Sequence, residues 1–190
     1  MEKPILFSAP MVKAILKGRK TMTRRVLKKQ PPFLARIRHG WFSAPIYGFT
    51  DEDCPAANWW KIRCPYGQPG DQLWVRETWM QPEHDPGKYR YKATNPSYIG
   101  RWKPSIHMPR VASRITLEVA DVRVERLQEI SETDAGAEGL QDWYPDPKKP
   151  NAAPYFTNKA RFTDLWESIN GKKHPWDSNP WVWVVEFKRV

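Results

Sequence analysis

The sequence predicts a single α+β domain: a small, mostly antiparallel β-barrel with helices on its outside or end. Its length of 190 residues suits one good hydrophobic core and is too short for two of ordinary size. The predicted elements run helix, several strands, two helices, strand, without the strand–helix alternation of a doubly wound parallel sheet. Proline-rich stretches at about 30–69, 80–112 and 141–158 lack periodicity, which predicts long loop insertions in this one domain.

The first predicted helix begins after Ser8, which can cap it, and tolerates Pro10 in its first turn. Gly18 suits the left-handed residue beyond its end. Alternating β-branched residues predict a strand over 21–26, and a second strand over 72–77 follows a Gly-Asp turn. In the first predicted helix the apolar face is formed by Met11, Val12, Ile15 and Leu16.

The second half of the chain predicts a long strand or hairpin, two helices and a last strand. The apolar parity of residues 113–127 changes near Ala120 and Asp121, which indicates a bulge or bend. Ser131, with Asp134 three residues later, resembles a capping box and begins a short helix that runs to about 139. The next helix ends near 170–171, and 181–187 is the final strand. The apolar positions of the second of these helices, at i, i+3, i+4 and i+7, are Phe162, Leu165, Trp166 and Ile169.

Charge is concentrated at one end of the chain. Residues 1–40 hold 11 basic residues against Glu2 alone, which accounts for the whole net charge of +10. Such a field favours a polyanionic partner, most simply nucleic acid, about as well as it favours a solvated basic face. No run of 18 apolar residues and no apolar leader are present, so we expect a cytoplasmic protein without a membrane partner. A protein partner is not indicated.

The sharpest local feature is the segment from Gly18 to Arg25. On a strand Thr21, Thr23 and Arg25 face one way, and Lys20 lies at the helix-to-strand turn. Crowded cations and burial both lower the pKa of a lysine, and a neutral lysine can take the proton of a threonine nucleophile. Spacing alone favours the simpler interpretation of a basic strand that binds phosphate.

This segment also resembles the signature of ASCH domains, small proteins whose fold is related to the PUA β-barrel. About 70 to 80 residues of core strands and helices are covered, in the expected order. The long form, with Trp79 and Trp183, looks like versions carried by phages and prophages. The segments that match are Lys20–Arg25, Gly70–Val75, Thr116–Val119, Ile130–Glu138 and Val182–Phe187.

The resemblance implies an activity, because some small ASCH proteins are amidohydrolases that remove the acyl group from N4-acetylcytidine. Their lysine, threonine and glutamate fall here on Lys20 as base, Thr23 as nucleophile and Glu138 as proton donor to the leaving cytosine amine. Arg25 could hold the base or the oxyanion. A lone glutamate at a helix end is otherwise most often exposed.

Further substrate-binding candidates are Thr21, Arg24, Trp74 and Glu77. Glu77 shares parity with the apolar residues of its strand and needs a cationic partner, for which we expect Arg25 or the neighbourhood of Arg76. A buried structural Glu–Arg pair is as good an interpretation of Glu77 as a substrate contact.

No metal or cofactor site is predicted. The four histidines are scattered, and Cys54 and Cys64 lack knuckle spacing, so a zinc site is a weak possibility. Trp166 and Trp183 are predicted core residues. Loop tryptophans beside basic residues could stack bases or pin loops to the barrel; they are Trp41, Trp59, Trp60 and Trp102.

Three functions remain open from the sequence. The leading one is hydrolysis of an N4-acylcytosine amide in a nucleoside. The first alternative is a non-catalytic RNA- or DNA-binding module. The second is a ribonuclease; the sequence positions no histidine pair for it, although a lysine and a glutamate could take that role.

Overall fold

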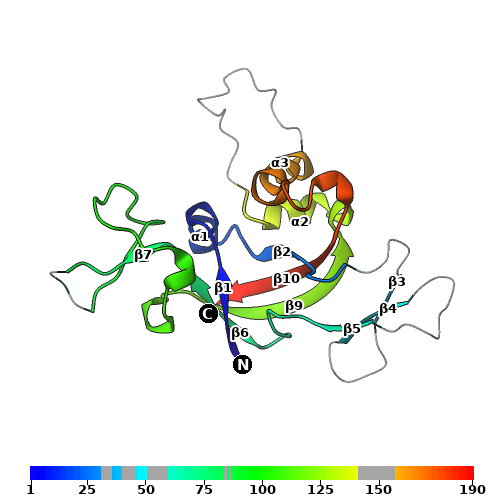
Figure 1. Cartoon of the computed structure of the whole chain (residues 1–190), viewed down its shortest axis with the longest axis horizontal. Coiled ribbons are helices and arrows are strands. Elements are labelled where there is room, and N and C mark those ends of the chain that lie inside the picture. The colour runs from blue at the N-terminus through cyan, green and yellow to red at the C-terminus, as the bar shows by residue number, and fades with distance from the viewer. Residues whose placement is uncertain (31–35, 40–45, 51–59, 84, 86, 141–156) are drawn as a thin grey trace, which may run out of the picture.

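The computed structural model of the chain describes residues 1–30, 36–39, 46–50, 60–83, 85, 87–140 and 157–190. Within these residues the fold is α+β, as predicted, with three α-helices and a mixed sheet of five strands (Figure 1). The helices are α1 (Ala9–Leu16), α2 (Glu132–Ala137) and α3 (Asn158–Asn170). The strands of the main sheet are β1 (Glu2–Leu6), β2 (Met22–Val26), β6 (Gln72–Arg76), β9 (Thr116–Arg126) and β10 (Trp181–Arg189).

The main sheet has the strand order β1-β6-β9-β10-β2. β1 pairs with β6 in parallel, and the other three pairings are antiparallel. β10 therefore lies between the long strand β9 and the short strand β2, so that Val185 is opposite Thr23 on one side and Val122 on the other. This register fixes where the conspicuous Lys-Thr-x-Thr segment meets the rest of the fold.

The predicted barrel is not closed. β1 and β2 are the two edges of the sheet, and no backbone ladder joins them in the described residues. α1 links these strands along the chain instead, and the guanidinium of Arg25 reaches across to the carbonyl oxygen of Leu6 at 2.6 Å. A side-chain hydrogen bond thus takes the place of the strand pairing that would close a barrel, and within the described part of the chain one edge of β2 has no partner strand.

Alternate residues of β10 pack against two different clusters. Trp183, Val185 and Phe187 belong to the core that includes β1 and α1, whereas Val182 and Val184 face the side covered by α2 and α3. Figure 1 shows α2 and α3 stacked over that side of the sheet. Burial on both faces explains why the first five residues of β10, Trp181–Val185, are an unbroken apolar run.

Local signals in the sequence are confirmed at several points. The β9–β10 register skips Ala120, which is the predicted bulge, and the skip keeps apolar residues of both halves of β9 on one face. Gly18 has φ +71° beyond α1, and the Ser131 hydroxyl accepts the backbone N–H of Asp134 at the start of α2. α3 ends immediately before Gly171.

The predicted loops hold more structure than expected. The 30–69 stretch contains a three-stranded antiparallel sheet of β3 (Arg36–His39), β4 (Ile46–Thr50) and β5 (Trp60–Arg63). The 80–112 stretch forms an arm that starts with a hairpin of β7 (Trp79–Met80) and β8 (Arg90–Tyr91). Strands of two to five residues are too short to show an alternation that outweighs the surrounding prolines. Most of the 141–158 insertion, like Trp41, Cys54 and Trp59, lies outside the described residues.

Candidate functional site

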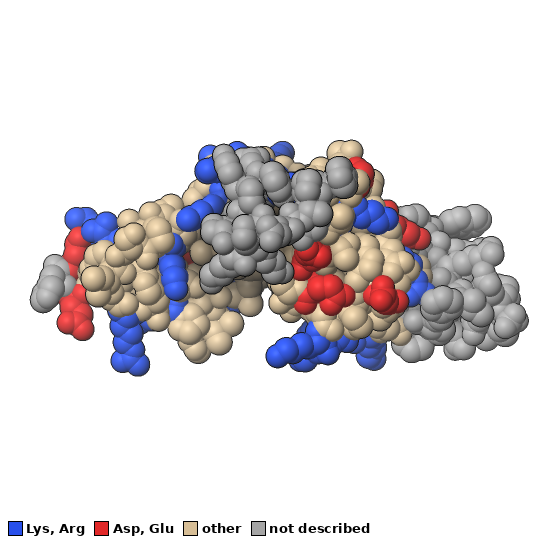
Figure 2. Space-filling model, turned by 90° about the horizontal axis from the view of Figure 1, so that it is seen from above, with Lys and Arg blue, Asp and Glu red and all other residues tan. Residues whose placement is uncertain are grey.

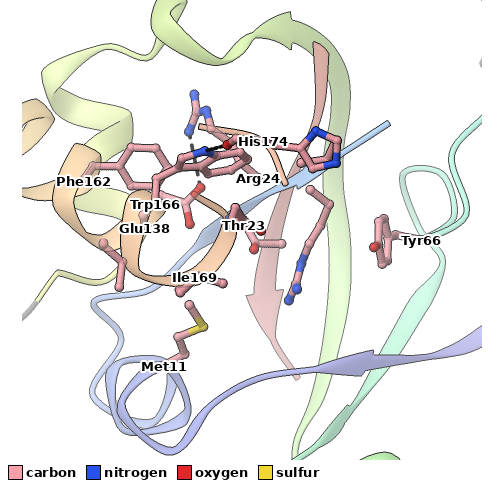
Figure 3. Close-up of a pocket in the computed structure, with 13 residues that line it drawn as sticks. Met11, Thr23, Arg24, Tyr66, Glu138, Phe162, Trp166, Ile169 and His174 are labelled. Atoms are coloured by element: carbon pink, nitrogen blue, oxygen red, sulfur yellow. Dashed lines mark hydrogen bonds and ion pairs between the residues drawn. The ribbon is translucent and has the colours of Figure 1, made fainter. Parts of the chain in front are cut away.

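A cavity of about 200 Å³ lies along the unpartnered edge of β2, between that strand and α3 (Figure 3). Four consecutive residues of β2, from Thr23 to Val26, line it. The other lining residues are Met11 from α1, Tyr66, Glu138, five residues of α3 (Phe162, Leu165, Trp166, Ile169 and Asn170) and His174. Polar and charged side chains therefore face an apolar wall that α3 supplies.

The register of β2 explains which groups face this cavity. The carbonyl of Thr21 accepts from Phe187 and the N–H of Leu27 donates to Trp181, so odd-numbered residues pair with β10. In an antiparallel ladder the intervening residues turn their N–H and C=O groups the other way, so Arg24 and Val26 present theirs at the open edge. The side chain of Thr23 lies on the sheet face of the first core, and that of Arg24 on the face of α2, as the alternation predicted.

Lys20 and Glu138, 118 residues apart, meet in a buried ion pair. The Lys20 Nζ donates to Glu138 Oε2 at 2.7 Å and to the Glu138 backbone carbonyl at 2.7 Å. The two residues are only 2% and 4% exposed. The resemblance named both as site residues, and the fold brings them together; Glu138 lines the cavity directly, with Lys20 behind it.

Backbone geometry makes this approach possible. Lys20 forms a backbone bridge with Glu138, and the N–H of Thr21 donates to the carbonyl of Ala137 at 2.9 Å. Gly139 follows with φ +82°, and a Cβ there would lie 2.5 Å from the Cβ of Lys20. Glycine is thus required both by the left-handed conformation and by the space.

The environment of Lys20 shifts the pKa of its ammonium below the ordinary value. Burial lowers the pKa of the ammonium, and the charges of Arg25 and Arg24 lower it further, whereas the carboxylate of Glu138 acts in the opposite direction. The ammonium also lies 5.6 Å from the ring centre of Phe7. A lysine held in this way can act as a base once its proton has a nearby acceptor.

Arg24 is buried and is surrounded by carboxylates. Its Nη2 lies 2.8 Å from Asp134 Oδ2 and 3.1 Å from Glu125 Oε2, and its Nη1 lies 3.5 Å from Glu138 Oε1. Figure 3 shows this side chain directed toward Glu138 and α3. The guanidinium that we expected to bind substrate is therefore largely engaged within the protein.

Thr23 and Arg25 offer groups to the cavity. Thr23 is 3% exposed, and its hydroxyl has no hydrogen bond with any described residue. Arg25 stacks on Phe7 at 5.3 Å and uses Nη2 for Leu6, and its buried Nε has no partner within the described chain. A buried donor without a partner is costly unless a ligand satisfies it.

The other candidate residues lie elsewhere. Thr21 is exposed, and Trp74 lies beneath the guanidinium groups of Arg76 and Arg110 at 5.5 and 6.0 Å; neither lines the cavity.

Glu77 is fully buried and forms a two-pronged ion pair with Arg114 at 2.9 and 3.1 Å. The prediction that Arg25 or the neighbourhood of Arg76 pairs with Glu77 was wrong. The partner is Arg114, 37 residues further along the chain, and no local pattern around Glu77 indicates it. Arg114 also contacts the arm, through Thr94 Oγ1 at 3.3 Å and the ring of Tyr91 at 4.0 Å, so the pair holds in place a side chain on which the arm packs.

Sequence reasoning missed the apolar wall. Helical spacing placed Leu165 and Ile169 on the apolar face of α3; Ile169 is 56% exposed, and both line the cavity. Helical periodicity identifies a face without saying whether a neighbour or a cavity covers it. Tyr66 and His174, in irregular segments, carried no signal.

The basic N-terminal segment does not form one uniform basic face. Lys20 and Arg24 are buried and paired, whereas Lys13, Lys17, Lys28 and others are exposed. Figure 2 shows basic side chains at several separate places on one face, with acidic side chains between them, both at one end and near the centre. Among the described residues no cluster of three His, Cys, Asp or Glu could hold a metal ion. The same residues include no helix with the length and apolar character needed to cross a bilayer.

Comparison with known proteins adds no relative: no family model, curated protein or solved structure matches the chain significantly. The resemblance to ASCH domains therefore rests on the motifs themselves.

Proposed function

We propose that the protein hydrolyses the amide bond of N4-acylcytosine compounds, with Lys20, Thr23 and Glu138 as its catalytic residues. The observation that carries this proposal is the buried Lys20–Glu138 pair, at 2.7 Å, beside a cavity that Thr23 lines with a hydroxyl lacking a partner in the described chain. A nucleophile and an acid then line one cavity, with a base in contact with the acid behind it, and amide cleavage uses these three groups.

The first half of the reaction forms an acyl-enzyme. Transfer of one proton from Lys20 Nζ to Glu138 Oε2, across the 2.7 Å contact, leaves a neutral amine and a neutral acid ready for the reaction. Lys20 takes the Thr23 proton as the threonine oxygen attacks the acyl carbonyl, and the unpartnered Arg25 Nε can hold the oxyanion. Glu138 protonates N4 as the carbon–nitrogen bond breaks, and cytosine amine leaves.

The second half restores the site. The Glu138 carboxylate accepts a proton from water, which attacks the ester on Thr23, and Lys20 returns its proton to the threonine oxygen. The net change is addition of one water to the amide, giving a carboxylic acid and a cytosine amine.

The test is chromatographic detection of cytidine after incubation of the purified protein with N4-acetylcytidine. We expect Thr23→Val and Lys20→Met to lower kcat by at least about 100-fold, since positioned acid–base groups contribute that much. Thr21→Val is the matched control, because Thr21 is an exposed threonine on the same segment outside the cavity. The proposal fails if the parent releases no cytidine, or if Thr23→Val is as active as the control.

A second candidate function, an RNA- or DNA-binding module without catalysis, is favoured by one observation on the arm. Arg101 and Lys103 are exposed and form no ion pair with a described carboxylate, and they flank Trp102. Trp102 packs edge-on against Tyr98, whose side chain is 41% exposed. Cations interleaved with accessible rings suit phosphates and unstacked bases.

Salt dependence separates this candidate from nucleoside hydrolysis. The logarithm of the association constant for a labelled single-stranded oligonucleotide should fall linearly with the logarithm of the salt concentration, with a slope of about −0.7 per phosphate contact. Replacing Arg101 and Lys103 by Gln should flatten this slope, whereas the same change at exposed Lys172 and Lys173, beyond α3, should not. Equal effects of both pairs would contradict binding through the arm, and cleaved oligonucleotide would instead identify a ribonuclease.

A further inference from the structure

We propose that Arg24 is a positioning residue that holds the Glu138 carboxylate in its reactive orientation. This inference rests on the proposed function, because it assigns a role toward the glutamate that would protonate the leaving amine. Arg24 acts through Glu138 in this account, and the residues that it contacts on its other side keep it in place.

The two oxygens of Glu138 are held by two different cations. Oε2 lies 2.7 Å from Lys20 Nζ, and Oε1 lies 3.5 Å from Arg24 Nη1. A glutamate with one fixed oxygen can still turn its carboxyl plane, whereas two contacts from different directions fix it. The side chains of Arg24 and Glu138 are 1% and 4% exposed, so bulk solvent screens these contacts little.

Arg24 is anchored more firmly to other carboxylates than to Glu138. Its Nη2 contacts Asp134 at 2.8 Å and Glu125 at 3.1 Å, both shorter than its contact with Glu138. These two carboxylates balance the guanidinium charge and orient its plane, as a rigid fork requires. The longer contact can guide Oε1 while leaving Glu138 free to exchange a proton with Lys20.

Arg123 supplies a matched control. It contacts the same two carboxylates, Glu125 and Asp134, from a half-buried position, and it forms no described contact with Glu138. Removing either guanidinium therefore disturbs the same ion-pair network, but only Arg24→Gln releases Glu138. A purely structural role for Arg24 would make the two variants alike in every respect except stability.

The kinetic test compares Arg24→Gln with Arg123→Gln on N4-acetylcytidine. We expect Arg24→Gln to lower kcat by about 100-fold, the effect of displacing a reacting group by about 1 Å, with KM nearly unchanged. Arg123→Gln should keep the parent kcat. Equal kcat in the two variants overturns the proposal. If Arg24→Gln does not fold, the charge-balanced double variant with Asp134→Asn takes its place, against Arg123→Gln with Asp134→Asn.

A spectroscopic test is independent of activity, so it separates failure of the proposed function from failure of this inference. The Lys20 ammonium, held in two hydrogen bonds and shielded from water, should give a slowly exchanging ¹H–¹⁵N signal below neutral pH. Glu138→Gln shows how that signal changes when the carboxylate is lost. We expect Arg24→Gln to shift or broaden it likewise, and Arg123→Gln to leave it unchanged. A parent-like Lys20 signal in Arg24→Gln overturns the positioning role, whether or not the protein hydrolyses amides.

Discussion

The Lys20–Glu138 pair allows a stability prediction that does not depend on any activity. Removing one partner of a buried ion pair costs about 3–5 kcal/mol, because an uncompensated charge remains in the interior. The two partners are not equivalent: among described residues Glu138 is the one carboxylate within 4.0 Å of Lys20 Nζ, whereas Glu138 also has Arg24 at 3.5 Å. Glu138→Gln should therefore cost about 4–5 kcal/mol and Lys20→Met about 3 kcal/mol at pH 7.

The loss of unfolding free energy in the double variant Lys20→Met/Glu138→Gln should be smaller than the sum of the losses in the two single variants, by about 2–3 kcal/mol. Equilibrium unfolding in urea, followed by the fluorescence of the 11 tryptophans, measures all three. For a domain of this size each kcal/mol corresponds to about 2–4 °C in Tm, so Glu138→Gln should melt about 8–20 °C below the parent. Strictly additive single variants would refute the existence of a direct interaction between the two side chains.

The pH dependence of this penalty has a definite sign. Burial lowers the pKa of Lys20 in the folded protein below its unfolded value of 10.5. Between these two pKa values the unfolded state binds more protons than the folded state. The free energy of unfolding therefore rises as pH increases toward 10.5. Because Glu138 raises the pKa of Lys20, its replacement deepens the depression, and the cost of Glu138→Gln should shrink between pH 7 and pH 10. A penalty that is constant or grows with pH would contradict burial of the Lys20 charge.

Three further outcomes are expected. Gly139→Ala should separate Lys20 from its partner and lower stability by about 1–3 kcal/mol through backbone strain, measured as a fall in Tm; an unchanged Tm would show that the backbone relaxes freely. Cys64 is buried and burial raises its pKa to about 11, so in a Cys54→Ser variant the native protein should react with a thiol reagent at pH 8 far more slowly than the urea-unfolded chain, and equal rates would be inconsistent with this environment. Glu77→Gln should destabilise the protein by about 3 kcal/mol in urea unfolding while the 80–112 arm becomes more susceptible to limited proteolysis, and an equally resistant arm would show that this pair does not fasten it.

Elements with a strong local signal were predictable from the sequence. The parity change in β9 placed a bulge or bend near Ala120 and Asp121, and the register of the structure skips Ala120, because an extra residue must restore the apolar face. The end of α1 followed from Gly18, which has φ +71°, and the start of α2 from the capping hydroxyl of Ser131; Gly171 marked the end of α3, although its φ of −52° is open to any residue.

Long-range pairing was not predictable. β1 contains Pro4 and forms its ladder with β6, some 70 residues away, as the parallel edge strand of the sheet, where proline is tolerated. Whether a sheet closes depends on its two edge strands meeting, and no local pattern in either reports this, so the open sheet was missed.

The candidate site divides in the same way. Lys20, Thr23 and Arg25 were conspicuous as a motif, and alternation placed Thr23 and Arg25 on one face. The partners of Arg24 come from positions 101 to 114 residues further along the chain, and nothing in its own strand distinguishes a guanidinium that binds substrate from one that holds a carboxylate.

The separation of Lys20 and Glu138 along the chain bears on how the protein is made. At about 5–20 residues per second on the ribosome, the 118 residues between them take about 6–24 s to synthesise. Throughout that interval the carboxylate that pairs with Lys20 in the folded protein has not been synthesised, so burial of its ammonium is not compensated. β10, the partner strand of β2, has not yet been translated either. The N-terminal segment must therefore stay hydrated until Glu138 and then β10 emerge, and a release from the ribosome before β10 would leave its lysines, arginines and apolar residues exposed to chaperones and proteases.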